Sequence, residues 1–283
     1  MSLPPGAREA RRVGGGDINE AYHVLLRGEE AFVKTREDAG QGEYALEAAG
    51  LGWLAAPGAL RTPRVIEVGE KYLALEWVAP GALSAEGAEE LGRGLAMTHA
   101  AGAPRFGDPG IGERLGAQAG FGSLRLPNEP TDDWASFYAQ RRLLPLARIA
   151  AERGALSDAG VAAVERVCAR LDELVGAPEP PARLHGDLWA GNVHADTEGR
   201  PWLIDPSAYG GHREVDLAML RLFGLPSALA ERAFGAYEEA SPLAEGWRER
   251  VTLYQLLPLL VHAVLFGGSY RGAAERSANV YVR

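Results

Sequence analysis

Residues 184–206 read LHGDLWAGNVHADTEGRPWLIDP and hold three polar side chains at informative intervals. Asp187 precedes Asn192 by five positions, and Asp205 directly follows the apolar run 202–204, which predicts a short buried strand. In phosphoryl-transfer sites an aspartate takes the proton of the attacking hydroxyl, while an asparagine five positions on and an aspartate after the next strand hold Mg²⁺. The pattern therefore predicts such a site, with Asp187 as the base and Asn192 and Asp205 as metal ligands.

An ordinary β-hairpin with acidic ends is the alternative for this segment, because an aspartate and an asparagine at this spacing often occur by chance. The full combination is more specific, since His185 stands just before the aspartate, a turn follows Asn192, and a strand ends at Asp205. Agreement among several parts of the phosphoryl-transfer template favours the phosphotransferase interpretation. His185 is expected to brace the loop, which is a structural role.

Length, composition and charge bound the class of protein. The 283 residues suffice to bury a sizeable core and lie near the length at which one core divides into two lobes. A hydrophobic fraction of 47% and a charged fraction of 24% are typical of soluble globular proteins. The net charge of −9 argues against a nucleic-acid partner or an anionic membrane surface, because either needs clustered Lys and Arg.

No secretory or membrane-spanning segment is expected. The first residues lack the apolar region of a signal peptide. The longest apolar stretch, residues 251–266, contains Gln255, Pro258 and His262, so it is too short and too polar for a bilayer span. The single cysteine, Cys168, excludes an intramolecular disulfide. We expect a cytoplasmic protein with residues 251–266 as a buried core helix.

The expected fold class is α+β with two lobes. Residues 1–78 would form a nucleotide-binding lobe with a small antiparallel sheet and one helix, and residues 79–283 a larger, mainly helical lobe for catalysis and substrate binding. The hinge would lie at about 76–81, where a Pro-Gly pair follows the last strand. The Gly- and Pro-rich stretch 102–131 is too long for a plain connection and predicts a functional or family-specific excursion. Strands are expected at 21–26, 31–34, 64–68 and 72–78, and helices at 41–54, 85–101, 134–153, 158–175, 214–223, 228–240 and 245–266.

Three successive glycines, Gly14, Gly15 and Gly16, follow one predicted strand and precede another. Glycines allow backbone N–H groups to approach phosphate oxygens without obstruction by side chains. The segment is not a Walker A loop, because no Gly-Lys-Ser/Thr sequence closes it. Taken alone it is typical of a simple turn, whereas together with the downstream site it favours a loop that covers the phosphates of ATP.

Lys34 ends an apolar strand, and Glu47 lies in the predicted helix that follows, among the apolar residues of its inner face. A lysine that binds nucleotide phosphates needs a carboxylate to hold its long side chain in place. Glu47 is therefore the predicted partner of Lys34, and Glu43 is a competing residue expected to be more exposed. A solvated surface charge is the ordinary alternative for each of these residues, but the order of loop, strand lysine and helix glutamate favours the pair.

The end of the last N-terminal strand offers backbone groups to a nucleotide base. We expect Glu76 and Val78 to hydrogen-bond the adenine edge, with Trp77 packed nearby. The alternative is an edge strand that simply leaves the small lobe, and both interpretations can hold together.

Other catalytic classes find little support in the sequence. The six histidines form no pair at i, i+4, and with one cysteine a zinc site is disfavoured. No G-x-S-x-G elbow occurs, which disfavours a serine hydrolase, and the absence of a Ser/Thr-rich activation segment and of A-P-E weighs against a regulated protein kinase. Asp216, near a helix start, is expected to accept backbone donors of the catalytic loop. His212 and Glu214 are expected either to face the acceptor or to pack the lobe.

Further motifs extend over nearly the whole chain. They are GGG-x-IN-x-AY from Gly14, FVK ending at Lys34, HGDLWAGN from His185 and YG-x-HRE-x-DLAM from Tyr209. In these motifs the chain resembles the fructosamine/ketosamine-3-kinases, a branch of the protein-kinase-like fold near the aminoglycoside and choline kinases. The loop variant with Trp189 and the G-H-R-E-x-D run are far more specific than the kinase-like core alone.

The resemblance implies ATP- and Mg²⁺-dependent phosphorylation of the sugar O3 of ketosamines, the Amadori products of sugars with amines. Acceptors would be small ketosamines or glycated protein lysines, and because the phosphoesters release the amine, the family acts in protein deglycation. It implies the roles given above for the base, the metal ligands and the lysine–glutamate pair, and it places Trp189 against the sugar or its amine. Some relatives carry cysteine where this chain has Asp17, so a thiol switch in that loop is not expected.

Two other functions remain alternatives. One is another small-molecule kinase, acting on aminoglycosides or amino alcohols such as choline, which a panel of acceptors would distinguish. The other is a catalytically inactive nucleotide-binding module. The presence of Lys34, Asp187, Asn192 and Asp205 speaks against the inactive module.

Overall fold

The computed structural model describes residues 2–14, 19–111 and 118–282. It begins with a five-stranded antiparallel sheet in the order β1-β2-β3-β5-β4. A two-residue turn at Arg27 and Gly28, both with positive φ, joins β2 to β3 and suits the twist of an antiparallel pair. The four strands expected between residues 21 and 78 are present, and β1 is the strand predicted before the glycines. Their bounds are β1 (Ala7–Val13), β2 (Glu20–Leu26), β3 (Glu29–Thr35), β4 (Val65–Val68) and β5 (Tyr72–Glu76).

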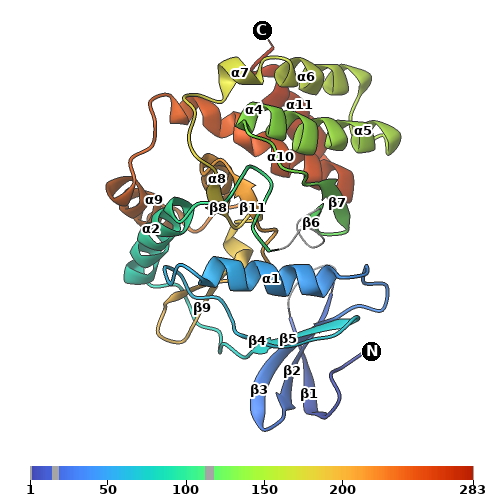
Figure 1. Cartoon of the computed structure of the whole chain (residues 1–283), viewed down its shortest axis with the longest axis vertical. Coiled ribbons are helices and arrows are strands. Elements are labelled where there is room, and N and C mark those ends of the chain that lie inside the picture. The colour runs from blue at the N-terminus through green and yellow to red at the C-terminus, as the bar shows by residue number, and fades with distance from the viewer. Residues whose placement is uncertain (1, 15–18, 112–117, 283) are drawn as a thin grey trace.

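Helix α1 (Glu43–Ala55) packs on this sheet. Its residues Tyr44 and Leu51 form a buried cluster with Leu73 and Leu75 of β5. Figure 1 shows α1 between the sheet and the helical part of the chain. The helix predicted to carry Glu47 is therefore in a position to connect the two parts.

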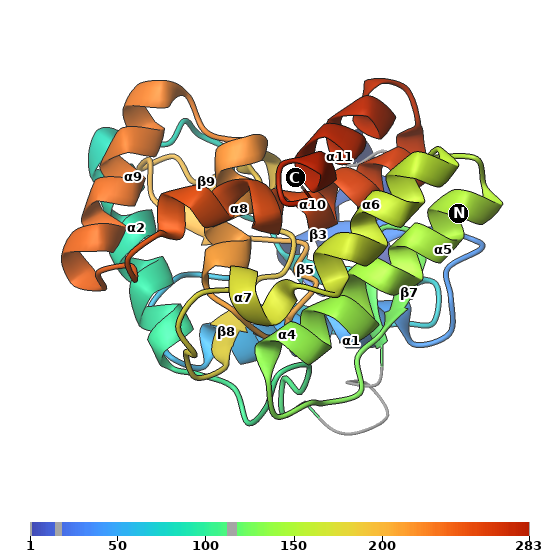
Figure 2. The same ribbon diagram turned by 90° about the horizontal axis from the view of Figure 1, so that it is seen from above.

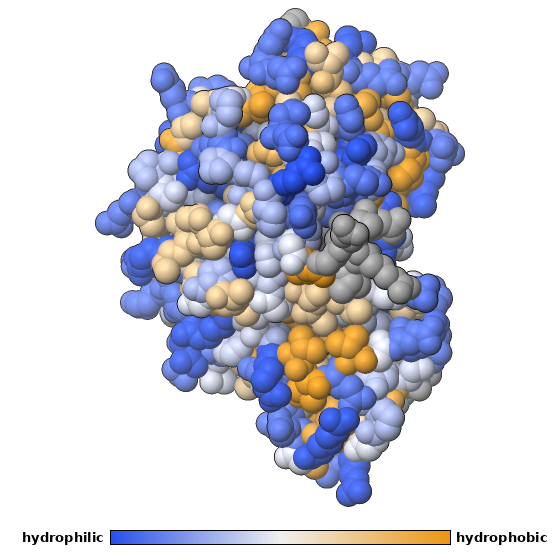
Figure 3. Space-filling model, in the orientation of Figure 1, coloured by the Kyte–Doolittle hydropathy of each residue, from blue (hydrophilic) through white to orange (hydrophobic). Residues whose placement is uncertain are grey.

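The larger part of the chain is helical, as expected (Figures 1 and 2). Helix α2 (Ala85–Ala100) packs closely on α9 (Ser227–Ala240), because Gly92 leaves room for the Ala233 carbonyl, which a Cβ would meet at 2.0 Å. Among the described residues α10 (Trp247–Phe266) is long and apolar enough to cross a membrane, but 61% of its apolar window is buried, as in a core helix. In Figure 3 the visible face is largely hydrophilic, with apolar side chains gathered near β4 and β5.

Two predicted helices are interrupted, and one helix was not predicted. The span 134–153 divides because Pro145 lacks the N–H of a continuous helix and a π-helical turn precedes it. The span 158–175 breaks after Cys168. Helix α11 buries only small side chains such as Ala274 and Ala278, so its apolar periodicity is weak. The elements are α4 (Trp134–Phe137), the π-helix Tyr138–Leu143, α5 (Leu144–Glu152), α6 (Asp158–Cys168), α7 (Leu171–Leu174), α8 (Glu214–Leu222) and α11 (Ser269–Asn279).

The excursion 102–131 contains a two-stranded hairpin, β6 (Gln118–Phe121) and β7 (Leu124–Pro127). Figure 1 shows this hairpin between the helical part and the α1 region. The stretch expected to be a functional or family-specific excursion thus supplies a structural element next to the predicted site.

Two small antiparallel sheets carry the segment quoted at the outset. Strand β8 (Ala182–Leu184) pairs with β11 (Tyr209–Gly211), and β9 (Val193–Ala195) pairs with β10 (Pro201–Leu203). Strand β10 is the strand expected at 202–204. Because Val193 lies opposite Leu203, the residues just outside this pair, Asn192 and Ile204, are neighbours, and the Ile204 N–H donates to the Asn192 carbonyl at 3.1 Å. Local strand pairing therefore brings Asn192 and Asp205 to one place.

Candidate active site

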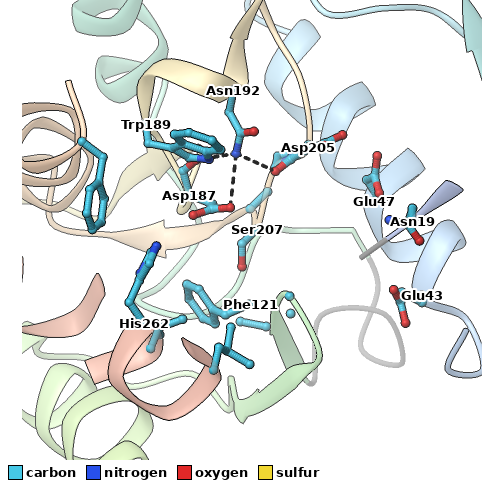
Figure 4. Close-up of a pocket in the computed structure, with 18 of the residues that line it drawn as sticks. Asn19, Glu43, Glu47, Phe121, Asp187, Trp189, Asn192, Asp205, Ser207 and His262 are labelled. Atoms are coloured by element: carbon cyan, nitrogen blue, oxygen red, sulfur yellow. Dashed lines mark hydrogen bonds between the residues drawn. The ribbon is translucent and has the colours of Figure 1, made fainter. Parts of the chain in front are cut away.

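A pocket of about 810 Å³ lies where the sheet with α1 meets the helical part. Asp187, Asn192, Asp205 and Glu47 line it (Figure 4). Lys34 belongs to the same lining. Its other walls come from the β6–β7 hairpin, α10 and α11. A cavity of this size can hold a cofactor and a small acceptor, and its lining unites the predicted base, the two predicted metal ligands and the lysine–glutamate pair.

The loop that carries Asp187 is fixed by buried side chains. The Asp216 carboxylate accepts hydrogen bonds from the backbone N–H groups of His185 at 2.7 Å and Gly186 at 2.9 Å. The His185 ring nitrogen Nε2 lies 2.9 Å from the Ile204 carbonyl, which ties the loop to the end of β10. The supporting roles predicted for Asp216 and His185 are confirmed by these contacts.

Asp187 has the electrostatic surroundings of a general base. Burial, and after it the Asp205 carboxylate, raise the pKa of Asp187 to about 7, while a hydrogen bond from Asn192 acts in the opposite direction. That bond runs from Asn192 Nδ2 to Asp187 Oδ2 at 3.2 Å. A carboxylate whose pKa lies close to neutrality combines basicity with a substantial ionised fraction, which favours proton abstraction.

Asn192 and Asp205 offer oxygen ligands to a cation. Asn192 Nδ2 also donates to the Asp187 carbonyl at 2.8 Å, and Figure 4 shows the amide oxygen on the other side of the group. Asp205 has a φ of 53°, a left-handed conformation that aspartate tolerates, and its side chain is 45% exposed. One carboxylate and one amide oxygen suit Mg²⁺, which completes its shell with phosphate and water oxygens. The described residues contain no group of three or more His, Cys, Asp or Glu that could hold a metal.

Lys34 forms an ion pair with Glu47, as predicted, and its Nζ lies 2.9 Å from Asp205 Oδ1. The lysine side chain is only 6% exposed. Burial by itself would lower the pKa of Lys34, but the Asp205 and Glu47 carboxylates outweigh burial and raise the pKa above its ordinary value. Lys34 is therefore a fixed positive charge beside the predicted metal ligands.

Aromatic side chains line the other end of the pocket. His262 of α10 has its ring centroid 4.5 Å from that of Phe223 and 5.0 Å from that of Tyr270. Trp189 of the catalytic loop lines the same pocket and is 42% exposed. Such a surface suits an apolar stem and a cationic amine better than it suits phosphates.

His262 was not predicted as a site residue. Its Nδ1 lies 2.8 Å from the Pro258 carbonyl one turn earlier, so the ring donates there and presents Nε2 on its other side. Burial lowers the pKa of His262, which keeps the ring neutral at pH 7 and Nε2 able to accept a hydrogen bond. Figure 4 shows the side chain directed into the pocket. Its only sequence signal is a polar residue in the apolar run 251–266.

The predicted nucleotide-loop and hinge residues do not line this pocket within the described chain. Gly14 precedes the gap in the description, and Gly15 and Gly16 lie outside the described residues. The Val78 carbonyl lies 3.0 Å from His194 Nε2, and the Glu76 carboxylate accepts from the Arg64 N–H at 3.1 Å. The adenine contacts expected of Glu76 and Val78 stay predictions.

Neither His212 nor Glu214 lines the pocket, so of the two roles expected of them, facing the acceptor or packing the lobe, the structure shows the packing role. The Glu214 carboxylate is buried and pairs with Arg250 at 2.6 and 2.9 Å. The His212 ring is buried and stacks on Tyr254, with centroids 5.2 Å apart. Both side chains pack the helical part of the protein.

The buried His212 ring should make the protein less stable in acid. Burial lowers the pKa of His212 to about 4, although Glu179 opposes the shift. The unfolded chain takes up this proton below about pH 6.5 while the folded chain does not, so the stabilisation is complete above that pH and is lost as the pH falls toward 4. At pH 5 this effect has lowered the free energy of unfolding by about 2 kcal/mol.

Urea unfolding of wild type and His212→Phe at pH 7 and pH 5 measures this contribution. Phenylalanine keeps a ring for stacking and removes the titration, so the drop in the free energy of unfolding between the two pH values should shrink by about 2 kcal/mol. An equal drop in both proteins would contradict the assignment.

Comparison with known proteins decides the family. A family model described as fructosamine kinase matches residues 4–283. A protein named probable ketoamine kinase from Synechocystis sp. is 37% identical over 279 residues, covering 95% of this chain and 88% of the relative. The chain belongs to the fructosamine kinase family. A chloroplastic protein-ribulosamine 3-kinase from Arabidopsis thaliana is 33% identical over 279 residues, covering 96% of this chain and 82% of the relative.

A solved structure of this family has the same fold. A crystal structure from Thermobifida fusca, provisionally named fructosamine-3-kinase, is 44% identical and superposes with a TM-score of 0.87, covering 96% of this chain and 93% of that chain. The resemblance inferred from the motifs is thus confirmed for the fructosamine kinase family, and the expected fold class is confirmed with it.

Proposed function

We propose that this fructosamine kinase family member transfers the γ-phosphoryl group of ATP to the O3 hydroxyl of a ketosamine sugar. The observation that carries the proposal is the position of Asp187 within one pocket. On one side of it stand Asp205 and Glu47, both paired with Lys34, and toward the other side stand Trp189 and His262 (Figure 4). A base between a phosphate-binding end and an acceptor end is what in-line transfer requires.

Asp187 accepts the proton of the sugar hydroxyl, whose oxygen forms a bond to the γ-phosphorus. The bond from that phosphorus to the β–γ bridging oxygen breaks, and ADP leaves. Lys34, held by Glu47, binds the phosphates, and Asn192 with Asp205 would hold Mg²⁺, which neutralises phosphate charge when bound. Most of the rate enhancement would come from positioning and charge neutralisation.

The acceptor end favours ketosamines because it combines aromatic faces with one neutral hydrogen-bond acceptor. The secondary amine of a ketosamine is cationic and would lie on the Trp189 ring, while His262 Nε2 accepts from a sugar hydroxyl. The aromatic groups suit the methylene stem of a glycated lysine, so free ketosamines and glycated protein lysines are both proposed acceptors. The named relatives act on such compounds according to their names.

We place the enzyme in the cytoplasm, without nucleic-acid or membrane partners. The burial of α10 and the net charge of −9 support this placement. Cell fractionation with an antibody to the native protein tests it, and recovery in the membrane pellet would contradict it.

A panel of acceptors tests the function. ADP release would be measured with MgATP and, in parallel, ribulosyl-lysine, fructosyl-lysine, an aminoglycoside and choline. Turnover on a ketosamine alone is the expected result, and the panel ranks the sugars. Turnover on the aminoglycoside or choline only would retain the kinase chemistry and overturn the substrate class. ATP hydrolysis without any acceptor preference would overturn the assignment of the aromatic end.

Trp189→Ala should impair use of the ketosamine while leaving nucleotide affinity nearly unchanged. The indole contributes a cation–π face of roughly 1–2 kcal/mol, so kcat/KM for the acceptor should fall roughly tenfold. Trp189→Phe, which keeps an aromatic face, is the matched control and should lose less. Equal losses in acceptor use and in the Kd for nucleotide would show that Trp189 is a structural residue of the loop.

A further inference from the structure

The β6–β7 hairpin is joined to α1 by a shielded ion pair. Arg125 Nη2 of β7 lies 2.6 Å from Glu43 Oε2 at the start of α1. The same carboxylate accepts from Arg36 Nη2, at 2.9 and 2.8 Å, and from the Gly40 N–H at 3.1 Å. Glu43, expected to be exposed, has a side chain only 16% exposed, and that of Arg125 is 28% exposed. Partial burial makes this pair stronger than an open surface pair.

The hairpin itself is anchored in the core of the helical part. Arg142, which is completely buried, donates to the Pro127 carbonyl at 2.8 Å and to Asn128 Oδ1 at 2.7 Å. Its guanidinium lies over the rings of Phe137 and Tyr209, at 4.5 and 4.2 Å from their centroids. Arg125 also donates to two carbonyls of its own hairpin, at 2.9 and 3.0 Å, which orients its guanidinium. The hairpin is therefore attached to the helical part by buried contacts.

The first turns of α1 connect the hairpin to the nucleotide end of the pocket. Glu47 follows Glu43 by four positions, so both carboxylates project from one face of the helix. Glu47 binds Lys34. The hydroxyl of Tyr44, which lies between Glu43 and Glu47 in the sequence, donates to Asn19 Oδ1 at 3.0 Å, next to the glycine segment. A displacement of the first turn would therefore move the partner of Lys34.

The other end of α1 has a separate anchor. The Arg183 guanidinium lies 4.6 Å from the centroid of the Trp53 ring and donates to the Trp53 carbonyl. With that end held, loss of the Arg125 contact would free the N-terminal end of α1 from the hairpin and leave it only its contacts with Arg36, Gly40 and the sheet. Glu47 lies toward the end that would be released. Phosphotransferases of the kinase type need the lysine–glutamate pair in place before transfer.

We propose that Arg125 and Glu43 are positioning residues for phosphoryl transfer, because their ion pair fastens α1 to the hairpin and so keeps Glu47 on Lys34. This inference rests on the proposed function. It also gives the excursion 102–131 a role, because its hairpin holds α1 in place. In a regulated protein kinase a phosphorylated activation segment would have this role.

The test compares Arg125→Gln and Arg125→Lys with Arg232→Gln. Arg232 forms an ion pair of 2.7 Å with Glu89 between α9 and α2, away from the pocket, and is the control for loss of a cross-element pair. In Arg125→Gln the Kd for MgADP, measured without acceptor, should rise. The kcat should fall and the KM for ATP should rise, with a roughly tenfold loss in kcat/KM for ATP. Arg125→Lys should recover most of the loss, and Arg232→Gln should match wild type.

Three results would overturn the proposal. One is an Arg125→Gln protein with wild-type Kd and kcat/KM for the nucleotide. Another is a loss confined to the KM for the ketosamine, which would assign Arg125 to acceptor binding. The third is an equal loss in Arg125→Gln and Arg232→Gln, which would indicate general destabilisation. If wild type turned over no ketosamine, the proposed function would fail, whereas the Kd for MgADP would still decide the role of Arg125.

Discussion

Asp187→Asn should abolish phosphoryl transfer while MgATP still binds with nearly wild-type affinity. Asparagine has the shape of aspartate and can still accept the hydrogen bond from Asn192, so the loop should keep its structure. It cannot take a proton from the sugar hydroxyl, and general-base catalysis of this kind is worth roughly a hundredfold to ten-thousandfold. In the proposed mechanism nucleotide binding depends instead on Lys34 and the proposed metal ligands, which the substitution leaves in place.

Steady-state ADP release and calorimetric titration with a MgATP analogue measure the two quantities separately. Asp132→Asn is a suitable control, because its side chain is 90% exposed and pairs only with the solvent-exposed Arg105 among described residues. The control should match wild type in both assays. Undiminished turnover in Asp187→Asn would refute the base assignment, and a large loss of nucleotide affinity would place Asp187 among the metal or phosphate ligands.

The catalytic end of the pocket could be predicted from the sequence because its geometry is local. Asn192 and Asp205 flank one short strand pair, and Asp187 precedes Asn192 in a loop fixed by Asp216. Spacing along the chain therefore carries most of the information. Predicting the Lys34–Glu47 contact required more than local spacing, namely the order of a strand and a helix in a known template. The structure contains that contact.

The acceptor end and the hairpin could not be predicted, because they depend on packing between distant segments. His262 meets Phe223 and Tyr270 only after α10, α8 and α11 have packed together. Arg125 meets Glu43 across 82 positions of the chain, and no local pattern distinguishes this arginine from a surface charge. His212 is the opposite case, because its place in a motif next to the site left a role at the acceptor open, and only its burial in the fold shows that it packs the lobe.

Asp205→Asn should lower kcat about as much as loss of the base does, but by disturbing the binding of the metal and the nucleotide. The Asp205 carboxylate is 2.9 Å from Lys34 and is one of two proposed Mg²⁺ ligands, so its charge is needed both by the metal and by the lysine. Loss of such a preorganised electrostatic group costs roughly a hundredfold to a thousandfold in kcat. In addition, the pKa of Asp187 should fall, because the charge of Asp205 reinforces the effect of burial in raising it.

The decisive measurement is the Kd for ATP with and without Mg²⁺. In wild type Mg²⁺ should lower the Kd for ATP. In Asp205→Asn most of that gain in affinity should disappear. The Kd measured without Mg²⁺ should change little or decrease, because a negative charge near the phosphates has been removed. Asp38→Asn, an 89% exposed partner of Arg36, controls for loss of a carboxylate outside the pocket and should keep the full gain. If Asp205→Asn kept that gain as well, Mg²⁺ would be held elsewhere, and the role of Asp205 would reduce to orienting Lys34.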